Sequence, residues 1–117
     1  MAKKFNKNFG DRMGVVNAML FLGYWELDEK IALKEAAKIV TEALEKGLWP
    51  AEGINIIGYY SSVDVPTWGV MIFEAENPEQ VMKNIVALRQ IKPNYFKKVR
   101  VSPAMKAEEA ISILMGM

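Results

Sequence analysis

Apolar residues gather along this chain in four short runs, with longer segments of helical period between them. The first and third runs are apolar at consecutive positions, which is typical of central strands covered on both faces. In the fourth run two valines alternate with Lys98 and Arg100, which predicts one apolar and one basic face. The four predicted strands cover residues 18–25, 53–62, 67–75 and 95–101.

Capping residues mark where the helices begin. Asp28 is expected to cap the first helix, because a short polar side chain accepts the free N–H groups of a first turn. Asn77 followed by Pro78 predicts the start of the second helix, since proline suits the first helical position. Ser102 followed by Pro103 repeats this signal near the C-terminus. The predicted helices cover residues 29–46 and 78–91, and a last helix follows Ser102-Pro103.

This order, β-α-β-β-α-β with an extra C-terminal helix, is the ferredoxin-like pattern of an α+β domain. We predict one such domain over residues 18–117, preceded by an N-terminal arm at residues 1–17 that shows no periodicity. Right-handed crossovers place the first and third strands in the middle of the sheet and both helices on one face. The other face would expose a large apolar patch, which a monomer rarely leaves open. The pattern therefore predicts a homodimer through the open sheet face.

The side chains of that open face are the candidate site. Two such faces, packed together, would enclose an apolar lumen with a few polar groups, which is the general character of a small-molecule pocket. A slip of one residue in a strand would exchange the two faces. The face is predicted to carry Phe21, Trp25, Asn55, Tyr59, Trp68, Val70, Ile72, Glu74, Lys98 and Arg100. The predicted ligand-binding residues among them are Trp25, Asn55, Tyr59, Trp68, Glu74 and Arg100.

Composition narrows the chemistry that this site can perform. The 117 residues include no Cys and no His, which excludes thiolate nucleophiles, zinc sites of Cys and His, Ser-His-Asp triads and haem held by His or Cys. No D-x-D cluster supports a magnesium or calcium site, so we expect neither metal nor cofactor. Glu74 ends an apolar strand and is the candidate general base. Its alternative role is an ion pair with Arg100 or with a basic residue of the partner.

Charge and hydropathy bear on partners and location. The net charge is only +1. Residues 26–80, however, carry eleven acidic and four basic side chains, whereas residues 81–106 carry seven basic and no acidic ones. Solvated helix faces with ion pairs between elements would account for this, and a basic patch for an anion or nucleic acid is the alternative. No apolar run is long enough to span a membrane and no secretory signal is evident, so we expect a cytoplasmic protein without a membrane partner.

Four segments of the chain carry a resemblance to known proteins. They are MLFLGYWELD (19–28), GINIIGYYSSVD (53–64), WGVMIFEAENPEQV (68–81) and FKKVRVSPAMKAEEAI (96–111). They resemble a family of small uncharacterised proteins in the dimeric α/β-barrel superfamily, and the resemblance spans Met19 to Leu114. It implies a ferredoxin-like subunit whose open sheet face pairs with a second copy to form a barrel. The superfamily includes cofactor-free monooxygenases, haem enzymes, lactone isomerases and ligand-sensing domains, and the lack of His argues against the haem branch.

Three functions fit these observations. The first is a dimer that binds a small aromatic or acidic ligand without turnover. The second is a cofactor-free oxygenase or isomerase that uses Glu74 with Tyr59 or Asn55. The third is a nucleic-acid binder, because residues 20–23 and 68–73 resemble the stacking motifs of an RNA-recognition motif. In that resemblance Phe21 and Trp68 would stack bases, but a valine occupies the position of the second stacking aromatic, which makes nucleic acid an unlikely partner.

Overall fold

The computed structural model describes residues 18–117, so the arm predicted at residues 1–17 lies outside the described residues. The elements follow one another as strand, helix, strand, strand, helix, strand and helix, which confirms the predicted order. Their bounds are β1 Met19–Leu27, α2 Leu33–Glu45, β2 Asn55–Ser61, β3 Trp68–Ala75, α3 Pro78–Ile91, β4 Phe96–Pro103 and α4 Ala107–Met115.

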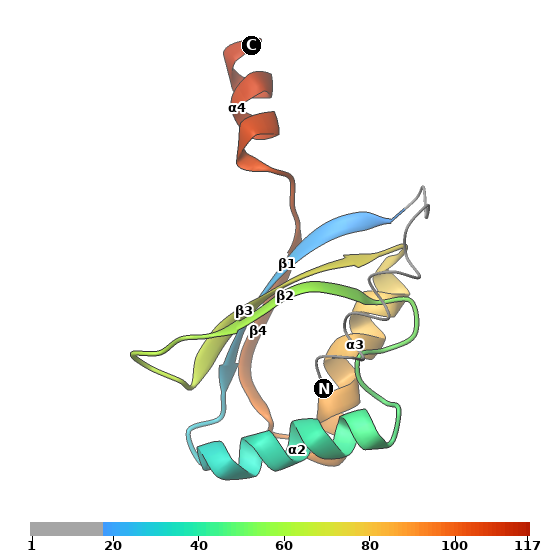
Figure 1. Cartoon of the computed structure of the whole chain (residues 1–117), viewed down its shortest axis with the longest axis vertical. Coiled ribbons are helices and arrows are strands. Elements are labelled where there is room, and N and C mark those ends of the chain that lie inside the picture. The colour runs from blue at the N-terminus through green and yellow to red at the C-terminus, as the bar shows by residue number, and fades with distance from the viewer. Residues whose placement is uncertain (1–17) are drawn as a thin grey trace.

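The four strands form one antiparallel sheet in the order β2-β3-β1-β4. The two strands that are apolar on both faces, β1 and β3, are the central ones, as the sequence predicts. Helices α2 and α3 lie on the same side of the sheet, as Figure 1 shows. Among residues 18–117 no helix covers the other side, which we call the open face, because α4 projects away from the sheet. No helix among residues 18–117 is long and apolar enough to cross a membrane.

The junction between β3 and α3 is built as its sequence predicts. Asn77 Oδ1 accepts the backbone N–H of Gln80 at 2.9 Å, and Gln80 Oε1 accepts the backbone N–H of Glu76 at 2.7 Å. Pro78 occupies the first turn of α3. These two hydrogen bonds satisfy N–H groups that a helix start would otherwise leave free. They fix the direction in which α3 returns across the sheet.

The starts of the other two helices were predicted wrongly. Asp28 Oδ1 accepts the N–H of Lys30 at 2.8 Å, so it stabilises a turn, and α2 begins later, at Leu33. Ser102 and Pro103 do not begin a helix either, because they complete β4 opposite β1. A proline is tolerated there because β4 is an edge strand. In each case a short polar residue serves a turn or strand end, which its type alone does not distinguish from a cap.

The register of the strands corrects the predicted open face. Phe21 and Trp25 are only 8% and 9% exposed and point toward the helices. Phe21 stacks on Phe73 at 5.5 Å. Placing Phe21 and Trp25 on the open face was wrong, because β1 is apolar on both sides and its pattern does not say which side faces the helices. Leu22 and Tyr24 occupy the open side instead, opposite Ile72 and Val70 of β3.

Tyr59 was also predicted on the open face, and this too was wrong. Asn55 lies opposite Glu74 on the open side, but Tyr59 lies opposite Met71 on the helix side. A β-bulge between Ile56 and Gly58 separates the two residues. One extra residue in a strand reverses the alternation of its side chains. The sequence suggested a bulge at this glycine, but its effect on Tyr59 became clear only from the register.

The uneven charge is partly explained by ion pairs between elements. Lys92 lies 3.7 Å from Glu35, and Lys97 lies 3.8 Å from Glu29, so basic residues of the C-terminal half meet acidic residues of the N-terminal half. These side chains are well exposed to solvent, and such pairs contribute little to stability. The pairs support the interpretation that most of the charge forms solvated faces.

Candidate ligand-binding cleft

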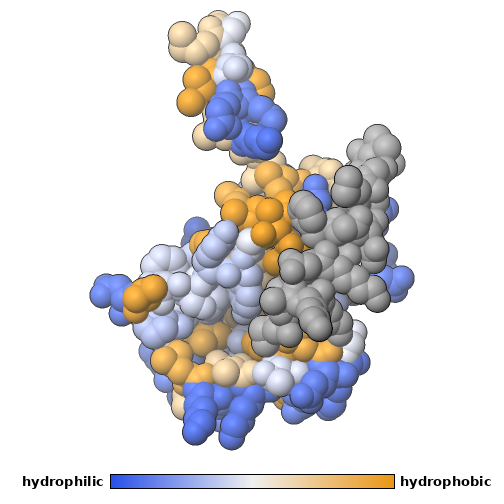
Figure 2. Space-filling model, in the orientation of Figure 1, coloured by the Kyte–Doolittle hydropathy of each residue, from blue (hydrophilic) through white to orange (hydrophobic). Residues whose placement is uncertain are grey.

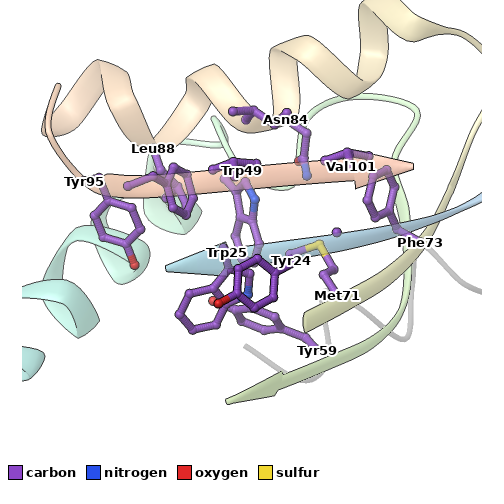
Figure 3. A pocket seen from close by; sticks show the side chains of 14 residues that line it. Tyr24, Trp25, Trp49, Tyr59, Met71, Phe73, Asn84, Leu88, Tyr95 and Val101 are labelled. Atoms are coloured by element: carbon purple, nitrogen blue, oxygen red, sulfur yellow. The ribbon is translucent and has the colours of Figure 1, made fainter. Parts of the chain in front are cut away.

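The structure contains an inner cavity on the helix side of the sheet. Its volume is about 40 Å³, and its walls are the central part of the sheet, helix α3 and the loop after α2. In Figure 3, Asn84 and Leu88 reach toward it from α3, whereas Trp25, Tyr59 and Met71 come from the strands. A space of this size holds a few water molecules or part of a small ligand.

A wider outer cleft adjoins the inner cavity. It measures about 250 Å³ and is lined mainly by α2 and the edge of β2. Trp25, Tyr59 and Tyr95 line both spaces. These three aromatic side chains are therefore the boundary between inner cavity and outer cleft. Together the two spaces have room for a compact ligand of one ring or two small ones.

An aromatic cluster builds this boundary. The ring of Tyr59 lies 6.1 Å from that of Trp25 and 5.4 Å from that of Trp49. Trp49 is only 1% exposed, although it belongs to the loop between α2 and β2. Asn84 Oδ1 accepts the N–H of Ala51 at 2.9 Å, which ties this loop to α3. The bond is buried, so it fixes the loop that carries Trp49 against the cavity.

Gly69 leaves the space that the indole of Trp25 occupies. It lies opposite Trp25 in the β1–β3 register. A Cβ at this position would overlap the indole of Trp25 and the backbone carbonyl oxygen of Tyr60. Glycine at this position therefore lets the indole lie flat across β3. The requirement is one of space, because the close approach of other atoms excludes a side chain.

The indole N–H of Trp25 is the unusual group in the cleft. Trp25 Nε1 is buried and has no hydrogen-bond acceptor within the described part of the chain. Buried donors are nearly always paired, and leaving one unpaired costs about 1–3 kcal/mol. The indole lies on the wall common to inner cavity and outer cleft.

The described residues give the cleft no charged side chain. Among residues 18–117, no Asp, Glu, Lys or Arg lines either the inner cavity or the outer cleft. Burial raises the pKa of Tyr59 above its ordinary value of 10.0. Burial, followed by the nearby Tyr59, raises the pKa of Tyr95 as well. Both side chains are therefore neutral phenols that can form hydrogen bonds but do not act as bases near pH 7.

The structure places Glu74 and Asn55 together on the other side of the sheet. Asn55 Nδ2 donates to Glu74 Oε1 at 2.8 Å. Asn55 is 1% exposed, and its Oδ1 has no partner within residues 18–117. The predicted partner of Glu74 was a basic residue, whereas the observed one is this amide. Tyr59 lies across the sheet from this pair, so the geometry does not support a site that combines Glu74 with Tyr59.

The open sheet face holds the remaining predicted residues. Trp68 and Arg100 lie there as predicted, and the Trp68 ring is 5.9 Å from that of Tyr24. Leu22 and Tyr60 on the same face are 49% and 59% exposed. Sequence reasoning missed Tyr24 and Leu22 because it assigned β1 to the opposite register. It missed Trp49 because this residue lies in a loop, where no periodicity indicates burial. Tyr95 was predicted as the first residue of the fourth strand but directly precedes β4, and it was not among the predicted site residues.

Metal binding finds no support in this part of the molecule. Among residues 18–117 there is no group of three or more His, Cys, Asp or Glu side chains that could hold a metal ion. The groups that line the cleft include aromatic rings, the phenols of Tyr24, Tyr59 and Tyr95, and the indole N–H of Trp25.

Known proteins resemble this chain in fold. No family model matches the sequence, and no curated protein matches it. A candidate antibiotic biosynthesis monooxygenase from Bacteroides thetaiotaomicron has a TM-score of 0.58 and 13% identity, covering 80% of this chain and 93% of its own. A protein described in the same words from Nitrosomonas europaea has a TM-score of 0.52 and 9% identity, covering 78% and 91%. A conserved protein from Methanosarcina mazei has a TM-score of 0.50 and 17% identity, covering 76% and 92%.

These likenesses confirm the fold expected from the resemblance in the sequence. The matches span three quarters or more of this chain and nearly all of each neighbour, so the complete β-α-β-β-α-β unit is similar. Identities between 9% and 17% are too low to carry over an activity. The function must be argued from the site itself.

Proposed function

We propose that this protein is a homodimer that binds a small, neutral, mainly aromatic ligand in the cleft between sheet and helices of each subunit. The observation that carries the proposal is the buried Trp25 Nε1–H, which has no acceptor among the described residues. A cleft with aromatic walls and one unpaired donor is suited to a flat ligand with one acceptor atom. This pocket lies on the helix side of the sheet, whereas the sequence predicted a pocket between the sheet and a partner subunit.

The lining defines the class of ligand. A carboxylate or an ammonium group would lose its hydration in a cleft without a charged partner, and this costs several kcal/mol. A carbonyl or ether oxygen loses much less and gains the indole N–H. The two phenols, Tyr59 and Tyr95, add further hydrogen-bonding groups at the boundary. We therefore favour a neutral aromatic ketone, ester, quinone or lactone over the acidic ligand that the sequence also allowed.

The open sheet face supports the homodimer. It combines Leu22, Tyr60 and Trp68, all substantially exposed, on one side of the sheet. Side chains of this kind in one patch mark an interaction surface. A second copy is the simplest cover, because two such faces can pack about 10 Å apart with interdigitated side chains. Nucleic acid is less favoured, since Phe21, one of the two residues expected to stack bases, faces the helices.

Binding can be tested with two probes that differ in one oxygen. Acetophenone carries a carbonyl acceptor, and ethylbenzene has nearly the same shape without it. NMR spectra of ¹⁵N-labelled protein resolve the indole N–H signals, and Trp25→Phe assigns that of Trp25. We expect acetophenone to shift this signal and to bind about 2- to 12-fold more tightly than ethylbenzene, as one hydrogen bond of about 0.5–1.5 kcal/mol allows.

Three controls decide the interpretation. The indole N–H of Trp68, on the far side of the sheet, should stay in place. Trp25→Phe should remove the preference for acetophenone while ethylbenzene still binds. Benzoate, which adds a charge, should bind more weakly than either probe. Equal affinity for both neutral probes, or a shift at Trp68 alone, would rule out the proposed site.

A further inference from the structure

Helix α4 is an apolar element against which no other helix or strand among residues 18–117 packs closely. Its stripe at Ala107, Ala110, Ile111 and Leu114 follows helical spacing, and none of its residues is buried. Ile111 and Leu114 are 58% and 68% exposed. In the space-filling view of Figure 2, α4 stands clear of the rest of the molecule with apolar side chains on its surface. A helix of nine residues is too short to be stable by itself in water, so its packing partner lies elsewhere.

An apolar groove that no described residue fills runs along α3, on the side toward the β4 edge of the sheet. It measures about 370 Å³ and is lined by Val81, Met82, Ile85 and Val86 of α3, with Phe21 and Val101 below. We call this the α3 groove. Met82 on its rim is 67% exposed. Helices commonly recognise partners by laying an apolar stripe into such a groove.

The chain between β4 and α4 directs the helix away from its own groove. The backbone N–H of Ala104 donates a hydrogen bond to the carbonyl oxygen of Leu20 at 2.9 Å, so the pairing with β1 continues past Pro103. Only Met105 and Lys106 remain before the helix, and Lys106 has an extended backbone. Two residues held in this way leave little room for a reversal of direction. The projection of α4 in Figure 1 follows from this geometry.

A second copy lies within reach of the projecting helix. Two free residues and nine helical residues span about 20 Å, at about 3.3 Å and 1.5 Å per residue. A partner sheet packed on the open face is about 10 Å away, and its helix layer lies about 10 Å farther. The span of the projecting segment is therefore comparable with the distance to the helix layer of a second copy packed on the open face. The charges also agree, since α4 carries Glu108 and Glu109 whereas Arg89 lines the groove.

We infer that α4 of each copy inserts into the α3 groove of the other copy. Each chain offers one helix and one groove, so a two-fold exchange satisfies both with the same contact made twice. The exchange rests on the homodimer of the proposed function, and the inserted helices would hold the two copies of that dimer together. It is nevertheless a separate contact, because the α3 groove lies on the helix side of the sheet.

Engineered cysteines can test this contact, because the full chain contains no Cys. One protein carries Ala110→Cys on the α4 stripe, and the other carries Val86→Cys on the groove rim. The two proteins are mixed, left to exchange subunits and oxidised. We expect a disulfide-linked heterodimer on a non-reducing gel. Ala110→Cys mixed with Lys34→Cys, on the exposed side of α2, is the matched control and should give none.

Each outcome has a defined meaning. A heterodimer for the groove pair alone supports the exchange. If the mixture gives no heterodimer, while a chain carrying both cysteines forms a disulfide within one monomer, α4 closes on its own groove and the exchange is overturned. Absence of both products also overturns it. Light scattering of the unmodified protein separates these results from the proposed function, because a dimer without the cross-link leaves the sheet-face interface standing.

Discussion

Gly69→Ala should disrupt the cleft by displacing the indole of Trp25. The added methyl group would occupy space already filled by the indole and by the carbonyl oxygen of Tyr60. The carbonyl oxygen of Tyr60 belongs to the backbone of β2, so both this strand and the Trp25 ring must shift. Forcing an extra carbon into a packed interior costs about 1–3 kcal/mol. For a domain near this size, each kcal/mol corresponds to a change in Tm of about 4–8 °C, so we expect a fall of about 4 °C or more.

Gly23→Ala is the matched control. Gly23 also lies in a central strand and lines the inner cavity. Its added Cβ would meet the nearest atom, on the Phe73 ring, at 3.5 Å, which is ordinary van der Waals contact. Alanine also loses less conformational freedom than glycine on folding. We expect unchanged or slightly higher stability, together with weaker acetophenone binding, because the methyl group fills part of the cavity.

Thermal unfolding followed by circular dichroism measures the difference. The two variants add the same group to the same sheet, so the comparison isolates the contact with Trp25. Tryptophan fluorescence adds a second readout, since a displaced indole should emit at longer wavelength. If Gly69→Ala melts at the wild-type temperature with unchanged emission, the close approach of the indole to β3 is wrong.

Three further predictions concern the loop, the phenols and the open face. Asn84→Ala should lower the free energy of unfolding, measured by urea denaturation, by about 1–3 kcal/mol, because it leaves the buried N–H of Ala51 unpaired. The control Gln90→Ala, at an exposed position of the same helix, should change this free energy by less than about 0.5 kcal/mol. Stability should fall as pH rises above 10.0, the ordinary pKa of tyrosine, because the raised pKa of Tyr95 keeps it protonated in the folded state while the unfolded chain ionises. Tyr95→Phe should make Tm less dependent on pH in this range. If Tm of the variant falls as steeply as that of the wild type, Tyr95 is not the cause of the decline. Leu22→Glu should convert the proposed dimer into a monomer in light scattering, because a carboxylate in an apolar interface is costly to bury. Leu33→Glu on α2, at a leucine of similar exposure (47% against 49%), should leave the proposed dimer intact.

The order of the elements could be predicted because local signals and the global fold agree. The apolar runs of β1 and β3 predicted their central place, and Asn77 with Pro78 predicted the start of α3. These signals act within a few residues, where hydrogen bonding and steric preference decide the conformation. The residues at which α2 and α4 begin were predicted less well, because Asp28 and Ser102 are equally suited to turns.

The candidate site could be predicted only in part. Trp68, Glu74 and Arg100 were placed on the correct face. For Arg100 the alternation of apolar and basic residues in β4 decided this face, whereas the pattern of β3, which is apolar on both sides, did not decide it for Trp68 and Glu74. Trp25 and Tyr59 line the cleft, but on the opposite side of the sheet from the one predicted. Trp49 and Asn84 could not be identified at all, because a loop residue and a polar residue in a helix show no pattern that indicates a cavity.

By itself, the sequence determined which segments become strands and helices and which strands lie at the centre of the sheet. Those properties follow from the spacing of apolar residues along the chain. The tertiary structure decided which face each strand presents, because a single bulge at residues 56–58 reverses the alternation of β2 and because β1 is apolar on both sides. It also decided that Trp25, Trp49, Tyr59 and Tyr95 meet in one cleft. Their meeting depends on contacts between residues far apart in the chain, which no local pattern contains.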